Sequence, residues 1–226
     1  MKILVIAAHP DDEVYGMGGT IAKLSNDGNE VHVLIVTDGS TIQYKNHSQL
    51  DQIITNKKNE IEKANRILGT KEIHFGNLPD MRLDSIDHIE INKVIEEAVN
   101  DINPQVVYTH FYGDVNLDHQ RVYEATLVAC RPIPNQVVKE IFCYRVPSST
   151  EWAPQNETSF FRANVINCIE NFEKQKSEAI EAYKTEIREY PHPRSVRAVK
   201  ALDLALGLKY GIGPAEEFIL LRKINS

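Results

Sequence analysis

The sequence has few cysteines, no long apolar runs and no excess of positive charge. Only three cysteines occur among the 226 residues, with no CxxC pair, so neither a zinc ribbon nor a disulfide framework is indicated. Reduced thiols and an N-terminus without a signal-peptide pattern predict a cytoplasmic protein. No apolar stretch approaches the ~20 residues of a membrane-spanning helix, so we expect no membrane span. The formal net charge of −7 disfavours a general nucleic-acid binder, because such proteins usually carry a basic face.

The chain does contain a regular alternation of apolar, strand-like segments and helical patterns. Strands are predicted at residues 2–8, 30–39, 71–78, 104–110 and 139–146. Helices are predicted at residues 18–24, 52–68, 84–100 and 119–129. This alternation predicts an α/β fold, with a mostly parallel sheet covered by helices on both faces. The last third adds predicted helices over 167–187 and 196–211 and a short strand over 218–222. With no evident linker, we expect a single domain over residues 1–226.

A dense cluster of ionisable side chains follows the first strand, in the HPDDE run of residues 9–13. Ligands of parallel sheets bind beyond the carboxyl ends of the strands, so this run should lie on the ligand-binding edge. The loop that follows His110, at the end of the fourth strand, should lie on the same edge. Adjacent acids at such a place are unfavourable unless a cation or a basic partner accompanies them. Solvation in an exposed loop is the alternative explanation.

The residue types in this run suit a metal site. Catalytic zinc takes three protein ligands and keeps one position open. His9 and Asp12 are three residues apart, a spacing that lets both side chains turn toward one point. His119, at the start of the helix after the fourth strand, is the strongest candidate for the third ligand. Asp11 would then be free to act as a general base.

The wider sequence resembles the PIG-L/LmbE-like family of zinc-dependent N-acetylglucosamine deacetylases. AAHPDDEVYGMGGTIAKL contains the family's AHPDDE signature, between a predicted strand and a predicted helix. NLDHQRV at 116–122 resembles the family's second motif, which usually ends in Asp-His. KKNEIEKANRILG, NLPD, KSEAIEAYKTEI and GPAEEFILLR resemble further family segments. The resemblance therefore covers nearly the whole chain.

This resemblance implies a Rossmann-like fold and a role for each matching residue. It implies that His9, Asp12 and His119 are the zinc ligands and that Asp11 is the base that activates a metal-bound water. Asp118 corresponds to the acid of the second motif, which orients a neighbouring histidine. Zinc is the implied metal, and ferrous iron is the alternative because two histidines and a carboxylate suit both.

The chain departs from the family pattern at one catalytic position. The family often has histidine where this chain has Asn116, and that histidine commonly polarises the amide carbonyl and stabilises the oxyanion. An amide can donate a hydrogen bond there, but it carries no charge. His192, in the YPHPRS segment, is a candidate replacement, and His110 is a second one. A surface turn and a structural histidine, respectively, are the alternative explanations.

Four residues are candidates for contact with the substrate. Lys57 stands where the family usually has arginine, and it keeps the charge but loses the bidentate geometry. Arg194 could bind an anionic or polyhydroxylated group, and Asp80 could bind sugar hydroxyls or simply form a turn. Trp152, the only tryptophan, could stack on a sugar ring or anchor its loop against the core.

We therefore predict a metal-dependent amidohydrolase that removes the acetyl group from an N-acetylglucosamine-type amino sugar or its conjugate. One alternative is a magnesium-dependent phosphohydrolase that uses Asp11 and Asp12. A second is a non-catalytic sugar-binding protein of the same fold. The expected partner is a small amino-sugar substrate, and homo-oligomer formation stays open.

Overall fold

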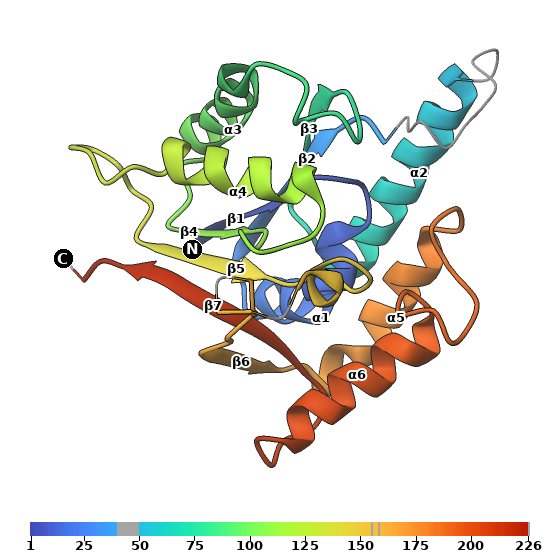
Figure 1. Ribbon diagram of the computed structural model, residues 1–226. Coiled ribbons are helices and arrows are strands. Elements are labelled where there is room, and N and C mark those ends of the chain that lie inside the picture. The colour runs from blue at the N-terminus through green and yellow to red at the C-terminus, as the bar shows by residue number, and fades with distance from the viewer. Residues whose placement is uncertain (40–49, 155, 158, 226) are drawn as a thin grey trace.

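The computed structural model describes residues 1–39, 50–154, 156–157 and 159–225. Within these ranges the strands form one seven-stranded sheet in the order β3-β2-β1-β4-β5-β7-β6 (Figure 1). Strands β1 to β5 pair in parallel, and β7 pairs antiparallel with both β5 and β6. The predicted mostly parallel, Rossmann-like fold is confirmed. The helices of the described ranges include none that is both long and apolar enough to cross a membrane.

Strands and helices alternate through the first two thirds of the chain, in the order expected of crossover connections. The strands are β1 (Lys2–Ala7), β2 (Glu30–Thr37), β3 (Glu72–Leu78), β4 (Val106–Thr109) and β5 (Glu140–Tyr144). The helices between them are α1 (Asp12–Asn26), α2 (Leu50–Leu68), α3 (His88–Ile102) and α4 (Leu117–Ala129). The central strands β1 and β4 are mostly apolar because helices cover both faces of the sheet, whereas the edge strand β3 contains Glu72, His74 and Asn77.

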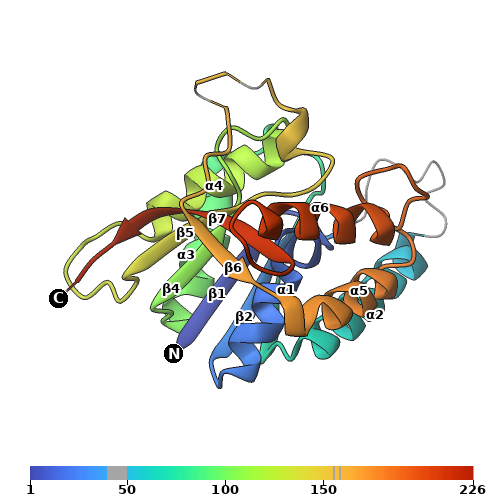
Figure 2. The ribbon, with the colours of Figure 1, turned by 90° about the horizontal axis from the view of Figure 1, so that it is seen from below.

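Two apolar cores lie on opposite faces of the sheet. Helices α3 and α4 cover one face, while α1, α2, α5 (Glu173–Ala182) and α6 (Val196–Leu208) lie on the other (Figure 2). Alternate residues of β1 divide between the cores: Val5 belongs to the α1 side, and Leu4 and Ile6 belong to the α3 side. All three side chains are fully buried. The central strand is therefore fixed on both faces, which makes its carboxyl end a rigid platform.

The last third differs from the prediction in one element. The segment predicted to begin a helix at residue 167 instead contains strand β6 (Val165–Cys168), and the helix α5 starts only at Glu173. β6 pairs with the long final strand β7 (Ala215–Lys223). The four-residue VINC segment has strand propensity, but the amphipathic pattern that follows it masked that signal.

Helix α1 begins earlier than predicted, at Asp12 rather than near residue 18. The acids of the HPDDE run therefore sit in the turn into the helix and in its first turn, where the helix dipole favours negative charge. Gly16 allows α1 to lie close against Tyr144 of β5, because a Cβ at residue 16 would lie 2.4 Å from the ring of Tyr144. The Tyr144 hydroxyl donates to the carbonyl of Ile6 at 2.8 Å, which ties β5 to β1 beneath the site.

Candidate metal centre and active site

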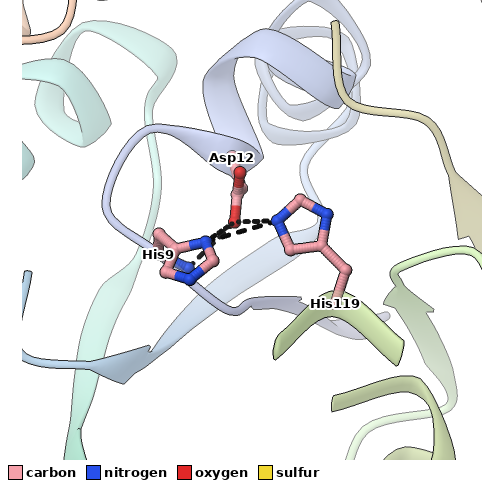
Figure 3. Close-up of side chains that lie close together, drawn as sticks. All are labelled: His9, Asp12 and His119. Carbon is pink, nitrogen blue, oxygen red and sulfur yellow. Dashed lines mark hydrogen bonds and ion pairs between the residues drawn. The ribbon is translucent and has the colours of Figure 1, made fainter. Parts of the chain in front are cut away.

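Three side chains meet at the carboxyl end of β1, and all point toward one another (Figure 3). His9 lies in the turn after β1, Asp12 opens α1, and His119 lies in the first turn of α4. Oδ2 of Asp12 is 3.2 Å from Nδ1 of His9 and 3.2 Å from Nε2 of His119. The two ring nitrogens are 3.3 Å apart. Residues more than a hundred positions apart in sequence are thus brought together, as expected for the carboxyl edge of a parallel sheet.

These separations suit a tetrahedral metal ion. Ligand atoms ~2.1 Å from a tetrahedral zinc lie ~3.4 Å from one another, close to the three distances found. Three protein ligands leave a fourth position for water or substrate, the arrangement typical of catalytic zinc. Oδ1 of Asp12 is buried and has no hydrogen-bond partner in the described part of the chain. A cation at this point would offset that carboxylate.

A carboxylate holds each of the two histidines through its second ring nitrogen. Nε2 of His9 lies 3.1 Å from Oδ2 of Asp118, and Nδ1 of His119 lies 3.2 Å from Oδ2 of Asp114. Such contacts fix the ring and leave the other nitrogen facing the metal position. Burial lowers the pKa of His119, but the carboxylates of Asp12 and Asp114 outweigh it and raise that pKa to about 9. The pocket between the rings therefore favours positive charge.

Asp114 is itself held in place by several donors. It accepts hydrogen bonds from the backbone N–H of Asn116 at 2.8 Å and from the hydroxyl of Thr150 at 2.6 Å. The hydroxyl of Ser149 donates a further short hydrogen bond. Burial alone would raise the pKa of Asp114, but His119 and the two hydroxyls outweigh it and lower that pKa to about 2. Asp114 thus remains a carboxylate that positions His119.

His110 lies beneath the metal ligands. Its ring stacks on that of His119, with the centroids 4.0 Å apart. Its Nε2 accepts the backbone N–H of Ala8 at 2.8 Å, and its side chain is fully buried. This placement gives His110 a supporting position under His119, which matches the structural alternative weighed from the sequence.

Asp11 lies beside the ligand set in a strained backbone conformation. Its φ is 103°, a region that side chains other than glycine rarely adopt. Its Oδ2 accepts a hydrogen bond from Nη1 of Arg194 at 3.0 Å, while Oδ1 is buried and has no hydrogen-bond partner among the residues that the structure describes. Burial raises the pKa of Asp11 well above its ordinary value, against the opposing effect of Arg194. One oxygen is therefore fixed by Arg194, and the other is not engaged by any described residue.

The buried carboxylate of Glu13 stabilises this turn. It accepts the backbone N–H of Asp11 at 3.2 Å, the Tyr183 hydroxyl at 2.6 Å and the amide of Asn65 at 2.9 Å. Strained backbone persists only where the surroundings fix it. Glu13 is therefore a positioning residue that the sequence argument did not assign, although it lies inside the HPDDE run.

A cavity of about 390 Å³ opens beside this centre. Its lining includes most of the residues predicted as base, donor or substrate contact, namely Asp11, Lys57, Asp80, Asn116, Trp152, His192 and Arg194. It also includes residues that the sequence argument did not single out, namely Met81, Ser148, Glu186 and Arg188. The topology therefore brings the C-terminal segment against the metal centre.

The side chains on the cavity wall differ in their exposure and in how many of their polar atoms already have a hydrogen-bond partner. Nζ of Lys57 donates to Thr185 at 2.6 Å and to Glu186 at 2.5 Å, so its charge ties α2 to the segment after α5. Asp80 accepts a hydrogen bond from the hydroxyl of Thr37 through Oδ1 at 2.9 Å, whereas its Oδ2 is buried and no described residue bonds to it. Trp152 is 58% exposed and lines the cavity.

His192 and Asn116 differ as hydrogen-bond donors. Nδ1 of His192 accepts the backbone N–H of Arg194 at 3.1 Å, so in the neutral ring Nε2 carries the proton. Burial and the nearby arginines lower the pKa of His192, which favours that neutral form. The side-chain oxygen of Asn116 instead caps α4 by accepting from the N–H of Asp118 at 2.9 Å. Its amide nitrogen lies 3.8 Å from the sulfur of Met81.

Some of the missed residues left a signal in the sequence. Asp114 lies in the acidic loop before His119, and Ser149 lies just before Trp152. Their contact with His119 arises because the loops after β4 and β5 meet at the same edge, which residue spacing does not reveal. Glu186 lies at the end of the predicted helix and Arg188 directly follows it, and neither gave a signal beyond its charge.

The fold and the site together define an α/β protein with a His–Asp–His centre at the carboxyl edge of its sheet. The sequence pattern of the GlcNAc-PI de-N-acetylase (PIG-L) family matches residues 4–130, more than half of the chain, and the chain belongs to this family.

Curated relatives of this chain include named deacetylases. An uncharacterized deacetylase, YaiS, of Escherichia coli K12 is 33% identical over 155 residues, which are 65% of this chain and 75% of the relative. A probable N-acetyl-alpha-D-glucosaminyl L-malate deacetylase 2 of Bacillus anthracis is 25% identical over 188 residues, 81% of this chain and 80% of the relative. The predicted family of amide-hydrolysing deacetylases is thereby confirmed.

Solved structures share the fold. The N,N'-diacetylchitobiose deacetylase of Pyrococcus horikoshii, complexed with an inhibitor, superposes with a TM-score of 0.78 at 23% identity, over 98% of this chain and 84% of that chain. GalB of Pseudomonas putida KT2440, a 4-carboxy-2-hydroxymuconate hydratase, gives a TM-score of 0.76 at 18% identity, over 100% and 98% of the two chains. The same fold therefore occurs with more than one reaction, so the activity has to be argued from the residues of the site.

Proposed function

We propose that this protein is a metal-dependent deacetylase that releases acetate from an N-acetylated amino sugar or its conjugate. The observation that carries the proposal is the position of Asp11. A buried carboxylate, one oxygen of which has no partner in the described part of the chain, lies beside the three proposed metal ligands and on the wall of a cavity of about 390 Å³. The names of the Bacillus and Pyrococcus relatives, which include N-acetylglucosaminyl and diacetylchitobiose substrates, support this substrate class.

His9, Asp12 and His119 would hold the metal. A divalent cation there would polarise the acetyl carbonyl and lower the pKa of water toward ~7. Asp118 and Asp114 keep the second nitrogen of each histidine protonated, so that the metal-facing nitrogen of each ring offers a lone pair. Zinc suits this set of two nitrogens and one oxygen, and ferrous iron is the alternative.

Asp11 would remove a proton from the attacking water through its free Oδ1. Arg194 holds the other oxygen, so the carboxylate does not rotate as the proton is transferred. The new carbon–oxygen bond forms at the acetyl carbon. As the carbon–nitrogen bond then breaks, Asp11 returns the proton to the leaving amine, which gives acetate and a free amino sugar.

His192 is the proposed donor to the developing oxyanion. Its Nε2 carries the proton in the neutral ring, and its side chain lines the same cavity as Asp11. A neutral N–H donor stabilises negative charge in the transition state without needing to ionise. The amide nitrogen of Asn116 is the competing donor, since its oxygen is already occupied by the cap of α4.

The cavity wall offers contacts that suit a polyhydroxylated ring. Trp152 presents an exposed ring face near its opening, and His192 packs edge-on against it at 6.0 Å between centroids. Oδ2 of Asp80 is an unpartnered acceptor for a sugar hydroxyl. The charge of Lys57 is already matched by Glu186, so we assign it a role in shaping the wall.

The decisive experiment measures acetate release from a panel of N-acetylated amino sugars and their conjugates. The metal-free protein should be inactive, and stoichiometric zinc or ferrous iron should restore release, with the more active metal identified as the cofactor. Full activity in the metal-free protein would refute the metal mechanism. Magnesium-only activity toward phosphate esters would favour the phosphohydrolase, and sugar binding without acetate release would favour the binding protein.

Two further expectations accompany this function. We propose a cytoplasmic location, which fits reduced cysteines and small soluble sugar conjugates. We also propose that residues 1–226 act as one unit, because the C-terminal segment supplies Arg194 and His192 to a site that begins at His9. Fractionation, and separate expression of residues 1–130, would test these two points.

A further inference from the structure

A second group of metal-ligating side chains lies at the opposite end of the sheet. His32 comes from β2, while Glu72 and His74 come from β3. In the parallel register His32 is paired with Glu72, and Leu34 is paired with His74. Since alternate residues of a strand share a face, all three side chains project from the same face of the sheet. That face is the one covered by α3 and α4.

The three groups converge on one point. Nδ1 of His32 lies 3.2 Å from Nε2 of His74, and Oε2 of Glu72 lies 3.8 Å from each of these nitrogens. The corresponding separations for a tetrahedral zinc are ~3.4 Å. A small rotation of the Glu72 side chain, which is 62% exposed, would close the remaining gap. The fourth direction would remain open to water.

A hydrogen bond between the two histidines does not involve Glu72, whose Oε2 lies 3.8 Å from both of the facing ring nitrogens. His32 is only 6% exposed, and its Nε2 has no hydrogen-bond partner among the described residues. Among the described residues, Nε2 of His74 and Oε2 of Glu72 lie near its Nδ1. Imidazole nitrogen is the commonest protein ligand for metal ions.

We propose that His32, Glu72 and His74 form a second divalent-metal site, selective for zinc-like ions, that is separate from the catalytic centre. Two imidazole nitrogens and one carboxylate oxygen are ligands that such ions prefer. Because β3 is the edge strand of the sheet, a metal here would join it to β2. The site acts as a cross-link at the amino ends of the strands and takes no part in the chemistry at their carboxyl ends.

The test counts zinc ions per chain. Metal-free protein is equilibrated with zinc, freed of unbound ion, and analysed by plasma mass spectrometry. We expect about two zinc ions for the native chain, about one for His74→Gln, about one for His119→Ala, and none for the double variant. His88→Gln, which alters a histidine in neither cluster, should keep about two and serves as the control.

Other outcomes would overturn the proposal. About one zinc in the native chain, together with none in His119→Ala, would show that the two histidines share only a hydrogen bond. Equal stoichiometry in His74→Gln and the native chain would place the second ion elsewhere. If His74→Gln does not fold, Glu72→Gln replaces it, since an exposed carboxylate can be neutralised without disturbing the core.

Substitution with cobalt(II) adds a spectroscopic readout. The visible absorption of the cobalt form of His119→Ala should report a low-symmetry site with nitrogen and oxygen ligands, and His74→Gln should abolish that band in this background. Failure of this inference is distinguishable from failure of the proposed function. Two bound ions without acetate release would support the second site and contradict the proposed function. Acetate release with a single bound ion would support the proposed function and refute only the second site.

Discussion

The two ends of the sheet carry two histidine–carboxylate groups that differ in what surrounds them. At the carboxyl end, both histidines of the His9–Asp12–His119 group are held by a further carboxylate, and a cavity lies alongside. At the amino end, His32 is buried, no described residue bonds to its Nε2, and Glu72 is exposed.

This difference indicates why we expect only one of the two groups to form a reactive metal site. Ligands at tetrahedral spacing occur at both ends, and ligand spacing alone does not predict catalysis. The carboxyl end adds orienting carboxylates, a strained base with a free oxygen and room for a substrate. We expect the two ends to respond differently to substitution, and the following predictions test this from the largest effect to the smallest.

The largest effect is expected at Asp11. Asp11→Asn removes the proton acceptor but keeps a side chain of the same shape beside Arg194, so acetate release should fall by ~10²–10⁴-fold in kcat. The metal content should stay at the native level, because Asp12 and the histidines are unchanged. Exposed Asp84→Asn is the matched control and should behave as native. Near-native turnover of Asp11→Asn would remove Asp11 from the role of base.

The next effect separates the two candidate oxyanion donors. His192→Gln should lower kcat by ~10²-fold with little change in KM, because the lost hydrogen bond forms mainly in the transition state. Asn116→Ser removes the amide donor but keeps an oxygen that can cap α4, and it should lower kcat much less. The two variants are compared under saturating metal. A larger loss in Asn116→Ser would transfer the donor role to Asn116.

The fold and the meeting of His9, Asp12 and His119 at one edge were largely predictable from the sequence, whereas the supporting residues were not. Apolar strands alternating with helical patterns fix a parallel sheet, and such a sheet brings residues 9–13 and His119 to one edge. The position of Asp114 depends on how the loops after β4 and β5 meet, and loops have no periodic sequence pattern from which their geometry could be predicted. Strand β6 was missed because four residues carry too little pattern to outweigh the helix after them.

The third effect concerns the carboxylate that orients His119. Asp114→Asn replaces an acceptor facing Nδ1 of His119 with a group that can present an N–H instead, so we expect a ~10–100-fold loss in metal affinity or activity. Ser149→Ala, which removes one donor to Asp114, should have a smaller effect in the same direction. Competition with a chromophoric chelator measures the affinity. Unchanged affinity in Asp114→Asn would mean that the ring of His119 is fixed by its stacking on His110 alone.

The smallest effect is expected at the amino end of the sheet, on stability and not on turnover. His74→Gln should keep acetate release within about twofold of native, because the site lies across the sheet from the cavity. In the His119→Ala background, zinc at about ten times its Kd should stabilise the fold by ~1.4 kcal/mol through mass action. For a chain of this length that is a rise of ~3–6 °C in Tm. Adding His74→Gln should abolish the rise, and a chelator should reverse it in the parent variant. A zinc-induced rise that survives both substitutions would show that neither end of the sheet is the source of the effect, and the contrast between them would then rest on the catalytic measurements alone.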